Sequence, residues 1–393
     1  MLAVVATSAS FAQNPDAVKQ VMRAEKKSEA TNIMKEQEAT MTGEERAKAY
    51  NHIVGMAIAD NTKEQGKALT AKTPEEKDNR LVKQYKAAYD ALKYAQLCND
   101  ADNEPNEKGQ VKPKFKNKNA SRVIAMRNDL INGGLWAYNN KDYANAQKWF
   151  GMYAESHSND LFSETEAVTK ENNYGQISYY AALAAYFNKD YKKADKYALL
   201  ALESGDAEVK EDAIKLQLNS YQGRKDAGDI DSDYLIKKVK QVYKAYPDNE
   251  IAFGRYIAVL NEAGKKEEAN KELDKRLKAN PNDPMANAYV AQNAQEAGEY
   301  DKAIEAYTKV LVAQPDFMAV KYNLATCYRN KAVDLKNNNQ PYKDLIEKAK
   351  LSSRRYRLQT LMRLTSRQST SSALLMNSNS VYGLLFTVYS YIF

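Results

Sequence analysis

The sequence predicts an all-α protein built from antiparallel helical hairpins. Only 15 glycines and 9 prolines occur in 393 residues, which disfavours a turn-rich β fold. Apolar residues recur at helical spacing over long stretches. Three prolines, Pro247, Pro281 and Pro315, are evenly spaced along the chain. A fixed interval of about 34 residues is typical of a chain that repeats one small structural unit.

Other residue types keep the same interval. It separates Gly264 from Gly298, Ala269 from Ala303, and Leu277 from Leu311. We interpret each unit as a helix, a tight turn at the glycine, a second helix and a break at the proline. Glycine adopts left-handed backbone angles without strain, and proline cannot continue a helix.

The unit around residues 284–317 resembles the tetratricopeptide repeat family. That family's pattern combines a turn glycine, small residues where paired helices cross, aromatic residues between neighbouring repeats, and a closing proline. Gly298, Tyr300, Ala303, Tyr307 and Pro315 occupy five of those places. The resemblance implies a right-handed superhelical solenoid, and it is nearly silent on function because one fold serves many functions.

The resemblance extends over an array of about six units between residues 127 and 350. The units are 127–160, 175–208, a looser one at 209–249 with a polar loop at 223–233, then 250–283, 284–317, and a last one from Met318 with an enlarged loop at 337–341. The phrase Asn-Lys-Asp-Tyr occurs twice, at 140–143 and 188–191.

Residues 13–126 are predicted to be helical without a clear repeat. Thr42 before Gly43-Glu44-Glu45, and Thr73 before Pro74-Glu75-Glu76, each have the pattern of a helix start. A loop is predicted over 99–119. We expect an atypical first repeat or capping helices, which such arrays need for solubility.

Residues 1–12 have the pattern of the end of a signal peptide. A short apolar run at 2–7 is followed by Ser10 and Ala12, small residues that favour cleavage after Ala12. We therefore expect a periplasmic or otherwise exported protein, and a frayed apolar N-terminus is the alternative. The apolar run is too short to cross a bilayer, so no transmembrane span is expected there.

Residues 351–393 differ from the rest of the chain. They carry five arginines, no lysine and no acidic residue, whereas residues before them are rich in lysine and acids. Ser353 and Arg357 stand where the repeat requires apolar residues. We interpret this aberrant tail as the product of a frameshift, with a genuine divergent tail as the alternative. The net charge of +7 arises largely here, so it does not indicate a nucleic-acid surface.

The sequence offers little material for catalysis. It holds two histidines and two cysteines, Cys98 and Cys327, and lacks metal-protease, nucleophile-elbow and phosphate-loop motifs. An acidic segment at 100–104 has Pro105 where a calcium loop requires glycine. We therefore expect no enzyme activity, no metal and no cofactor, and most tyrosines are expected to pack in the core. Pairing of the two cysteines stays open.

The resemblance implies that ligands contact the first helix of each unit, which lines the concave groove. The family's groove positions fall on Arg255, Ala258, Asn261, Tyr289, Gln292, Gln295, Tyr322, Asn323, Thr326 and Arg329. A groove that is merely solvated is the alternative. The Lys-Asn-Asn-Lys-Arg clamp that some members use for acidic peptide tails is missing from matching positions.

These features predict a non-catalytic, exported scaffold that binds a protein or peptide in its concave groove. The chain is similar in style to periplasmic tetratricopeptide proteins of Bacteroidetes, so a cell-envelope complex is the expected setting. The alternative is a glycan-binding component of outer-membrane uptake. Trp136 and Trp149, the only tryptophans, both fall in repeat helices, which disfavours a tryptophan-rich sugar site.

Overall fold

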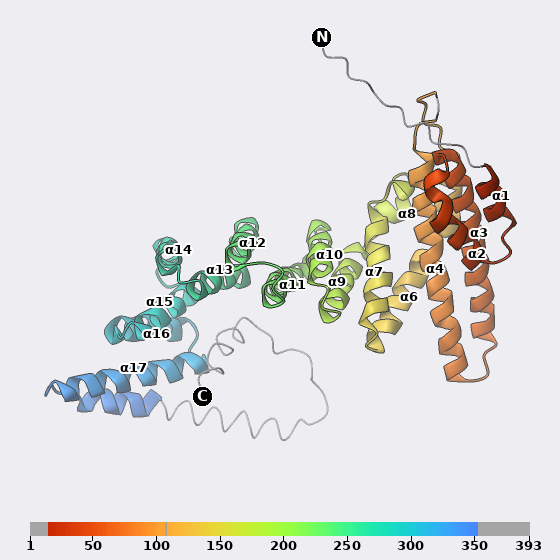
Figure 1. Ribbon diagram of the computed structural model, residues 1–393. Helices are drawn as coiled ribbons and strands as arrows, with labels where there is room; N and C mark the ends of the chain where they lie inside the picture. The colour runs from red at the N-terminus through yellow and green to blue at the C-terminus, as the bar shows by residue number, and fades with distance from the viewer. Residues whose placement is uncertain (1–14, 107, 353–393) are drawn as a thin grey trace, which may run out of the picture. The chain divides into compact units, whose positions relative to one another are not determined.

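The computed structural model describes residues 15–106 and 108–352 (Figure 1). All regular elements in these ranges are helices, and consecutive helices pack as adjacent pairs. This confirms the predicted all-α fold of helical hairpins. The chain divides into two compact units, Met1–Ala227 (unit 1) and Gly228–Phe393 (unit 2).

Unit 1 begins with a long hairpin flanked by short helices. Helices α3 (Gly43–Leu69) and α4 (Pro74–Asp102) lie side by side along their length (Figure 1). The short helices α1 (Pro15–Arg23) and α2 (Lys27–Gln37), followed by the turn η1 (Glu38–Thr40), pack against this hairpin. Buried alanine, valine and methionine side chains join them in one apolar core.

Both predicted helix starts in this hairpin are confirmed. The Thr42 hydroxyl accepts a hydrogen bond from the Glu45 amide, and the Glu45 carboxylate accepts one from the Thr42 amide at 2.9 Å. The Thr73 hydroxyl accepts from the Glu76 amide at 3.1 Å, with Pro74 in the first turn. Each such cap stabilises its helix by about 1 kcal/mol.

Two shorter hairpins follow, and they form the part of unit 1 that resembles the repeat. They are α6 (Met126–Asn139) with α7 (Tyr143–His157), and α9 (Tyr174–Phe187) with α10 (Tyr191–Glu203). The remaining elements are α5 (Lys116–Val123), η2 (Asp160–Phe162), α8 (Glu166–Thr169) and α11 (Ala207–Asp226). Residues 158–173, which carry η2 and α8, form an insertion between the two hairpins.

The repeated phrase Asn-Lys-Asp-Tyr makes the turn of each hairpin. Lys141 and Lys189 adopt left-handed angles, with φ of 60° and 61°. The aspartate after each lysine caps the next helix: Asp142 accepts from the Asn145 amide, and Asp190 accepts from the Lys193 amide. The phrase is therefore a structural signature that closes a tight turn.

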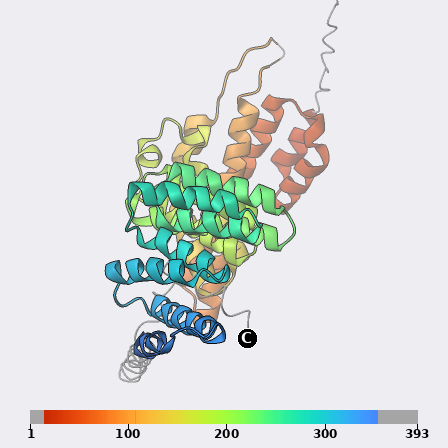
Figure 2. The ribbon, with the colours of Figure 1, turned by 90° about the vertical axis from the view of Figure 1, so that its left-hand side faces the viewer.

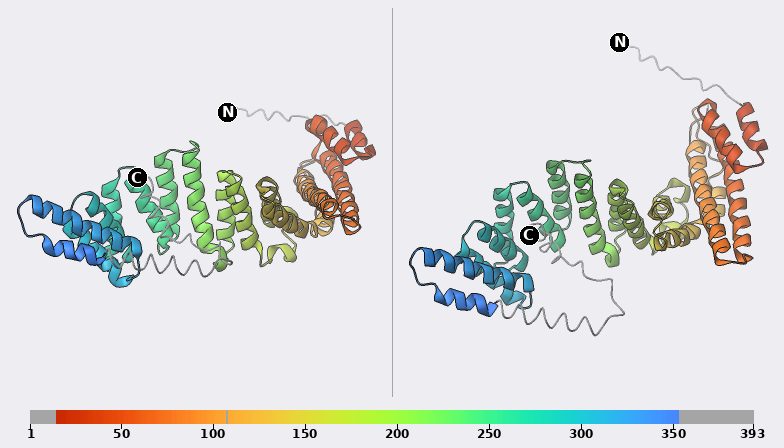
Figure 3. Two further views of the ribbon diagram at one scale, coloured as in Figure 1. Left: turned by 90° about the horizontal axis from the view of Figure 1, so that it is seen from below. Right: turned by 60° about the horizontal axis from the view of Figure 1, so that its bottom comes forward.

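Unit 2 contains the most regular repeats. Its helices are α12 (Ser232–Ala245), α13 (Glu250–Glu262), α14 (Lys266–Ala279), α15 (Pro284–Glu296), α16 (Tyr300–Ala313) and α17 (Met318–Asn337), followed by a helix at 343–352. Figure 3 shows α17 and the last helix as a blue hairpin.

The regular interval in the sequence corresponds to one hairpin in unit 2. Gly264 and Gly298 occupy the turns with φ of 72° and 76°, where an L-residue with a side chain would be strained. Pro281 and Pro315 lie in the breaks after α14 and α16. Unit 2 thus confirms the predicted order of helix, glycine turn, helix and proline break.

Two of the predicted loops, at 99–119 and 223–233, are shorter than expected. Helix α4 continues to Asp102 and α5 begins at Lys116, so the loop between them is shorter than the predicted 99–119 (Figure 2, light brown). The Asp102 carboxylate accepts hydrogen bonds from the backbone amides of Lys114 and Phe115 at 2.5 and 2.7 Å. This carboxylate therefore fixes the end of the loop, just before α5, to the end of α4.

Helix α11 runs through Gly223 to Asp226, so the predicted polar loop at 223–233 also begins later than expected. Gly223 is needed for packing rather than for a turn, because a Cβ atom there would lie 2.7 Å from the ring of Tyr191. The sequence pattern alone does not distinguish these two roles of a glycine.

Several predictions fall wholly or largely outside the described residues. These are the signal-peptide remnant at 1–12 and all but the first two residues of the tail at 351–393.

Cys98 and Cys327 are both buried free thiols, and burial raises the pKa of each to about 12. Across the described ranges, the structure contains no helix that is long and apolar enough to traverse a bilayer.

Ala303 tests the register of the repeat. It is completely buried on α16, among Ala291, Tyr307 and Leu324. The variant Ala303→Leu should overpack this crossing and lower the free energy of unfolding by roughly 1–3 kcal/mol. The control is Val312→Leu on the same helix, where the side chain is 81% exposed. Denaturant midpoints that do not distinguish the two variants would contradict the register.

Candidate functional site

The predicted groove residues lie on α13, α15 and α17 of unit 2, the first helices of its hairpins. The structure gives them three different environments. Some are used in contacts between helices, some bond within their own helix, and a few remain at the surface.

Tyr289 lies in the interior, not at a ligand surface. Its side chain is buried, and its hydroxyl donates a hydrogen bond to the Gly254 carbonyl at 2.9 Å. Burial raises its pKa to about 12. Tyr289 therefore joins α13 to α15.

Gln295 and Asn323 are also used to join helices. The Tyr307 hydroxyl donates to the Gln295 side-chain oxygen at 3.0 Å and accepts from the Asn323 amide at 3.2 Å. The Cys327 thiol approaches the same Gln295 oxygen at 3.4 Å. One glutamine thus links α15, α16 and α17.

The other predicted residues differ in exposure. The Asn261 amide donates to Asn293 at 3.3 Å, Gln292 donates to Glu296, and the Thr326 hydroxyl donates to the Tyr322 carbonyl. Arg255 and Ala258 are half-buried. Tyr322, at 53% exposure, and Arg329 extend into solvent. These last two are the best placed of the set to meet a ligand.

Sequence reasoning missed a cluster of aromatic side chains in unit 1. We define the aromatic cluster as Tyr138, Tyr143, Tyr179, Tyr180 and Phe187. The rings of Tyr143 and Phe187 stack with centroids 5.1 Å apart, and Tyr138 meets both at 5.5 and 6.1 Å. Tyr179 and Tyr180 lie with centroids 6.1 Å apart.

The ring contacts of the aromatic cluster form two groups, Tyr138 with Tyr143 and Phe187, and Tyr179 with Tyr180. Burial, Tyr143 and then Tyr180 raise the pKa of Tyr138, so the two groups influence each other electrostatically. Beneath them, the buried Phe150 meets Tyr180 with centroids 5.9 Å apart. Phe187 is 46% exposed, and the four tyrosines are half-buried. The cluster is thus supported from below and open on its outer side.

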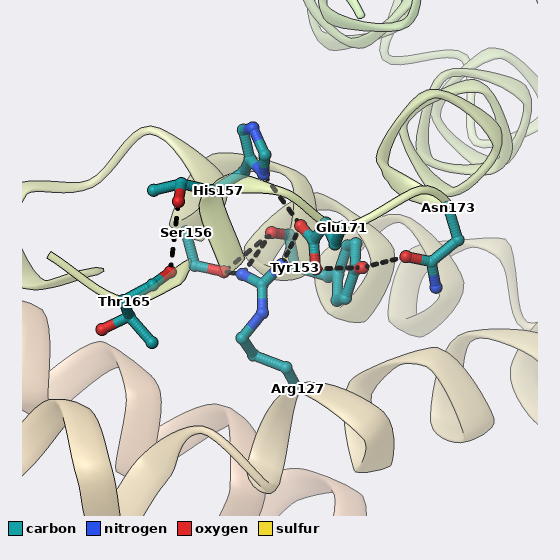
Figure 4. A network of polar contacts seen from close by, with 8 residues as sticks. Arg127, Tyr153, Ser156, His157, Thr165, Glu171 and Asn173 are labelled. Atoms are coloured by element: carbon teal, nitrogen blue, oxygen red, sulfur yellow. Dashed lines mark hydrogen bonds and ion pairs between the residues drawn. The ribbon is translucent and has the colours of Figure 1, made fainter. Parts of the chain in front are cut away.

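A second group of polar side chains fills the junction between α6, α7 and the insertion (Figure 4). Arg127 contacts the Glu171 carboxylate, the Ser156 hydroxyl and the Tyr153 carbonyl, and its guanidinium lies 4.1 Å from the Tyr153 ring centroid. The Tyr153 hydroxyl contacts Glu171 at 2.7 Å and Asn173 at 2.9 Å. We call this group the Arg127 network.

The Arg127 network contains residue types that occur in catalytic sites, but its geometry is that of a structural anchor. Arg127 has a side chain only 4% exposed. The His157 Nδ1 atom lies 2.9 Å from the Glu171 carboxylate, and the imidazole stacks on Tyr174 at 3.7 Å. These groups bond to one another, and they fix the insertion to the hairpin beneath it.

Metal chemistry has no candidate among the described residues, because no three histidine, cysteine or acidic side chains gather there in a way that would hold an ion. The acidic segment at 100–104 belongs largely to the end of α4, where Asp102 binds backbone amides.

Comparisons with known proteins add little beyond the fold. No protein-family model matches the sequence, and no curated protein matches it. Among solved structures, a TPR repeats protein from Bacteroides fragilis is 19% identical, with 58% of this chain and 86% of that chain covered and a TM-score of 0.30. A monomeric IFIT1 mutant solved with Gppp-AAAA is 17% identical, with 70% of this chain and 60% of that chain covered and a TM-score of 0.32.

Likenesses this distant say nothing about the ligand of this chain. The chain's own regular interval, its glycine turns and its paired helices give it the fold of a helical repeat of the tetratricopeptide kind.

The Arg127 network predicts that removing the charge of Glu171 destabilises the protein much more than removing the charge of Glu166. Glu171→Gln leaves a buried guanidinium without its carboxylate, and it should lower the free energy of unfolding by about 3 kcal/mol. Glu166→Gln is the control, because the pair of Glu166 with Lys170 is exposed and such pairs contribute little. Chemical denaturation measures both, and equal midpoints would show that the network does not anchor the insertion.

Proposed function

We propose that this chain is a non-catalytic scaffold that binds a peptide, or a segment of another protein, on the first helices of its hairpins. The observation that carries the proposal is the aromatic cluster, in which five neighbouring rings cover α6, α9 and the start of α7. A large, partly exposed aromatic surface of this kind is typical of interaction sites.

Tyrosine suits such a surface because its ring buries a large apolar area while its hydroxyl still finds hydrogen bonds. Aromatic residues therefore contribute strongly at protein interfaces. Leu135, 42% exposed one turn before Tyr138, and Leu183, half-buried between Tyr180 and Phe187, extend the apolar area along both helices. An extended peptide segment fits a surface that continues from one hairpin to the next.

In unit 2 the proposed contacts are Tyr322 and Arg329, the exposed members of the predicted groove set. The non-catalytic part of the proposal rests on the sequence, which lacks recognised catalytic motifs. It is supported by the Arg127 network, whose reactive side chain types bond to one another inside the fold.

Removing rings from the aromatic cluster should weaken ligand binding without unfolding the protein. Peptides selected on the full chain from a random displayed library should bind the double variant Tyr180→Ala/Phe187→Ala at least about tenfold more weakly, a loss of about 1.4 kcal/mol. Leu199→Ala on α10 is the control, because it removes a side chain of similar exposure outside the cluster.

Circular dichroism checks that helicity is unchanged, and titration calorimetry measures affinity. Unaltered affinity in the double variant would place the ligand elsewhere. Retardation by soluble polysaccharide in a native gel, abolished by the double variant and accompanied by no peptide binding, would replace this proposal with the glycan-binding alternative.

We further propose that the protein is exported and that its partner belongs to the cell envelope. The support is the pattern of an apolar run followed by Ser10 and Ala12. The intact mass of native protein should then correspond to a chain that begins at Gln13. A cytosolic form that retains residues 2–12 would contradict the proposal.

A further inference from the structure

The aromatic cluster lies beside an acidic side chain for which the described residues provide no partner. Tyr179 packs against a small apolar cluster formed by Ala201 of α10 with Val209 and Ala213 of α11, and Asp212 is next to Ala213 in the chain. Asp212 is exposed and forms no ion pair or hydrogen bond within the described part of the chain. Burial and the charge of Asp212 raise the pKa of Tyr179 to about 12, so this carboxylate lies close enough to influence the phenol.

The faces of the clustered rings are also free of cations, although the chain is rich in lysine. Elsewhere in unit 1, lysines cover tyrosine rings: Lys148 lies 4.1 Å from the centroid of Tyr89, and Lys93 lies 5.4 Å from that of Tyr94. No lysine or arginine of the described residues lies over Tyr138, Tyr143, Tyr179, Tyr180 or Phe187. Within the described part of the chain, no cationic side chain therefore competes for the exposed parts of these rings.

We propose that the aromatic cluster and Asp212 together bind a lysine or arginine side chain of the partner peptide. A cation is attracted to the face of an aromatic ring, and more strongly when the contact is shielded from water. The exposed carboxylate of Asp212 supplies the counter-charge next to Tyr179. Arginine fits best, because its planar guanidinium stacks on a ring while its N–H groups donate to a carboxylate.

This assignment gives the partner a definite chemistry. A basic side chain lies over Tyr179 and Tyr180, and apolar neighbours in the same peptide contact Phe187 and Leu135. The partner is thus a basic, partly apolar segment, opposite in charge to the acidic tails that the missing lysine clamp would bind. The inference rests on the proposed function, since it names the ligand class of the same site.

The test starts from the peptides selected on the full chain. Their sequences should be enriched in arginine or lysine at one position. Replacing that residue by glutamine in a synthetic peptide should weaken binding about three- to thirtyfold, as expected for a shielded cation–π contact. Asp212→Asn should weaken the original peptide about threefold, with less effect at high salt. The control is Asp226→Asn, the same change of charge at the far end of α11.

A second readout follows the phenol itself. A bound cation stabilises phenolate, so saturation with the arginine peptide should lower the pKa of Tyr179, and the glutamine peptide should not. This shift is measured by titrating the tyrosine absorbance with pH. The difference between the titration curves of the wild type and Tyr179→Phe gives the contribution of Tyr179.

The outcomes separate the two proposals. Selected peptides that depend on Tyr180 and Phe187 but tolerate loss of their basic residue and Asp212→Asn would overturn the cation inference and leave the proposed function standing. A library that yields no ligand dependent on the aromatic cluster would contradict the proposed function itself.

Discussion

The structure depends on how closely its paired helices approach, and small residues control that distance. A Cβ atom at Gly134 on α6 would collide with the Phe150 ring on α7. Ala194 on α10 and Ala303 on α16 hold the same place in the repeat register, and both are completely buried. Because Gly134 lets Phe150 lie directly between the helices, the Phe150 ring becomes the base on which Tyr180 rests. Core packing thus positions the surface that we assign to binding.

The turns add a second constraint, because they set where each second helix begins. The left-handed Lys141 and the capping Asp142 start α7 at Tyr143, which brings that ring back against Tyr138. The equivalent turn after α9 is tied to α7 by Gln147, whose side chain donates to Asp190 at 2.7 Å and accepts from Asn188 at 2.7 Å. Neighbouring hairpins are therefore fixed to each other at the end that carries the exposed Phe187.

The fold could be predicted from the sequence because its determinants are local. Gly298 in a turn, Pro315 after a helix and Thr73 before one act on their own few residues, and each has the predicted role. The environments of the groove residues could not be predicted in the same way. Residue spacing predicts which side chains share a face of a helix, but it does not predict which other helices pack against that face. Tyr289 and Gln295 occupy groove positions of the repeat, yet the structure uses both to join helices.

The aromatic cluster shows the reverse case, in which residues predicted to lie in the core are partly exposed. Tyrosines at helical spacing are usually core residues, so those of unit 1 were assigned to packing. The family's groove positions in 127–160 and 175–208 include Tyr138, Tyr179, Tyr180 and Phe187. Asp212 could not have been found this way, because its proximity to Tyr179 depends on how α11 packs.

The Arg127 network explains how the aromatic cluster forms although an insertion interrupts the repeat. The two copies of Asn-Lys-Asp-Tyr lie farther apart than the regular interval of unit 2, because the insertion at 158–173 separates the hairpins. A buried ion pair adds little net stability compared with an apolar contact, so its value here is positional. Arg127 holds Glu171, and His157 stacks on Tyr174, the first residue of α9. Fixing the start of a helix fixes its rotation, and the rotation of α9 decides which of its side chains face α6. The anchor at the start of α9 thus acts together with the packing of α9 on α7 and α10 to orient the aromatic surface.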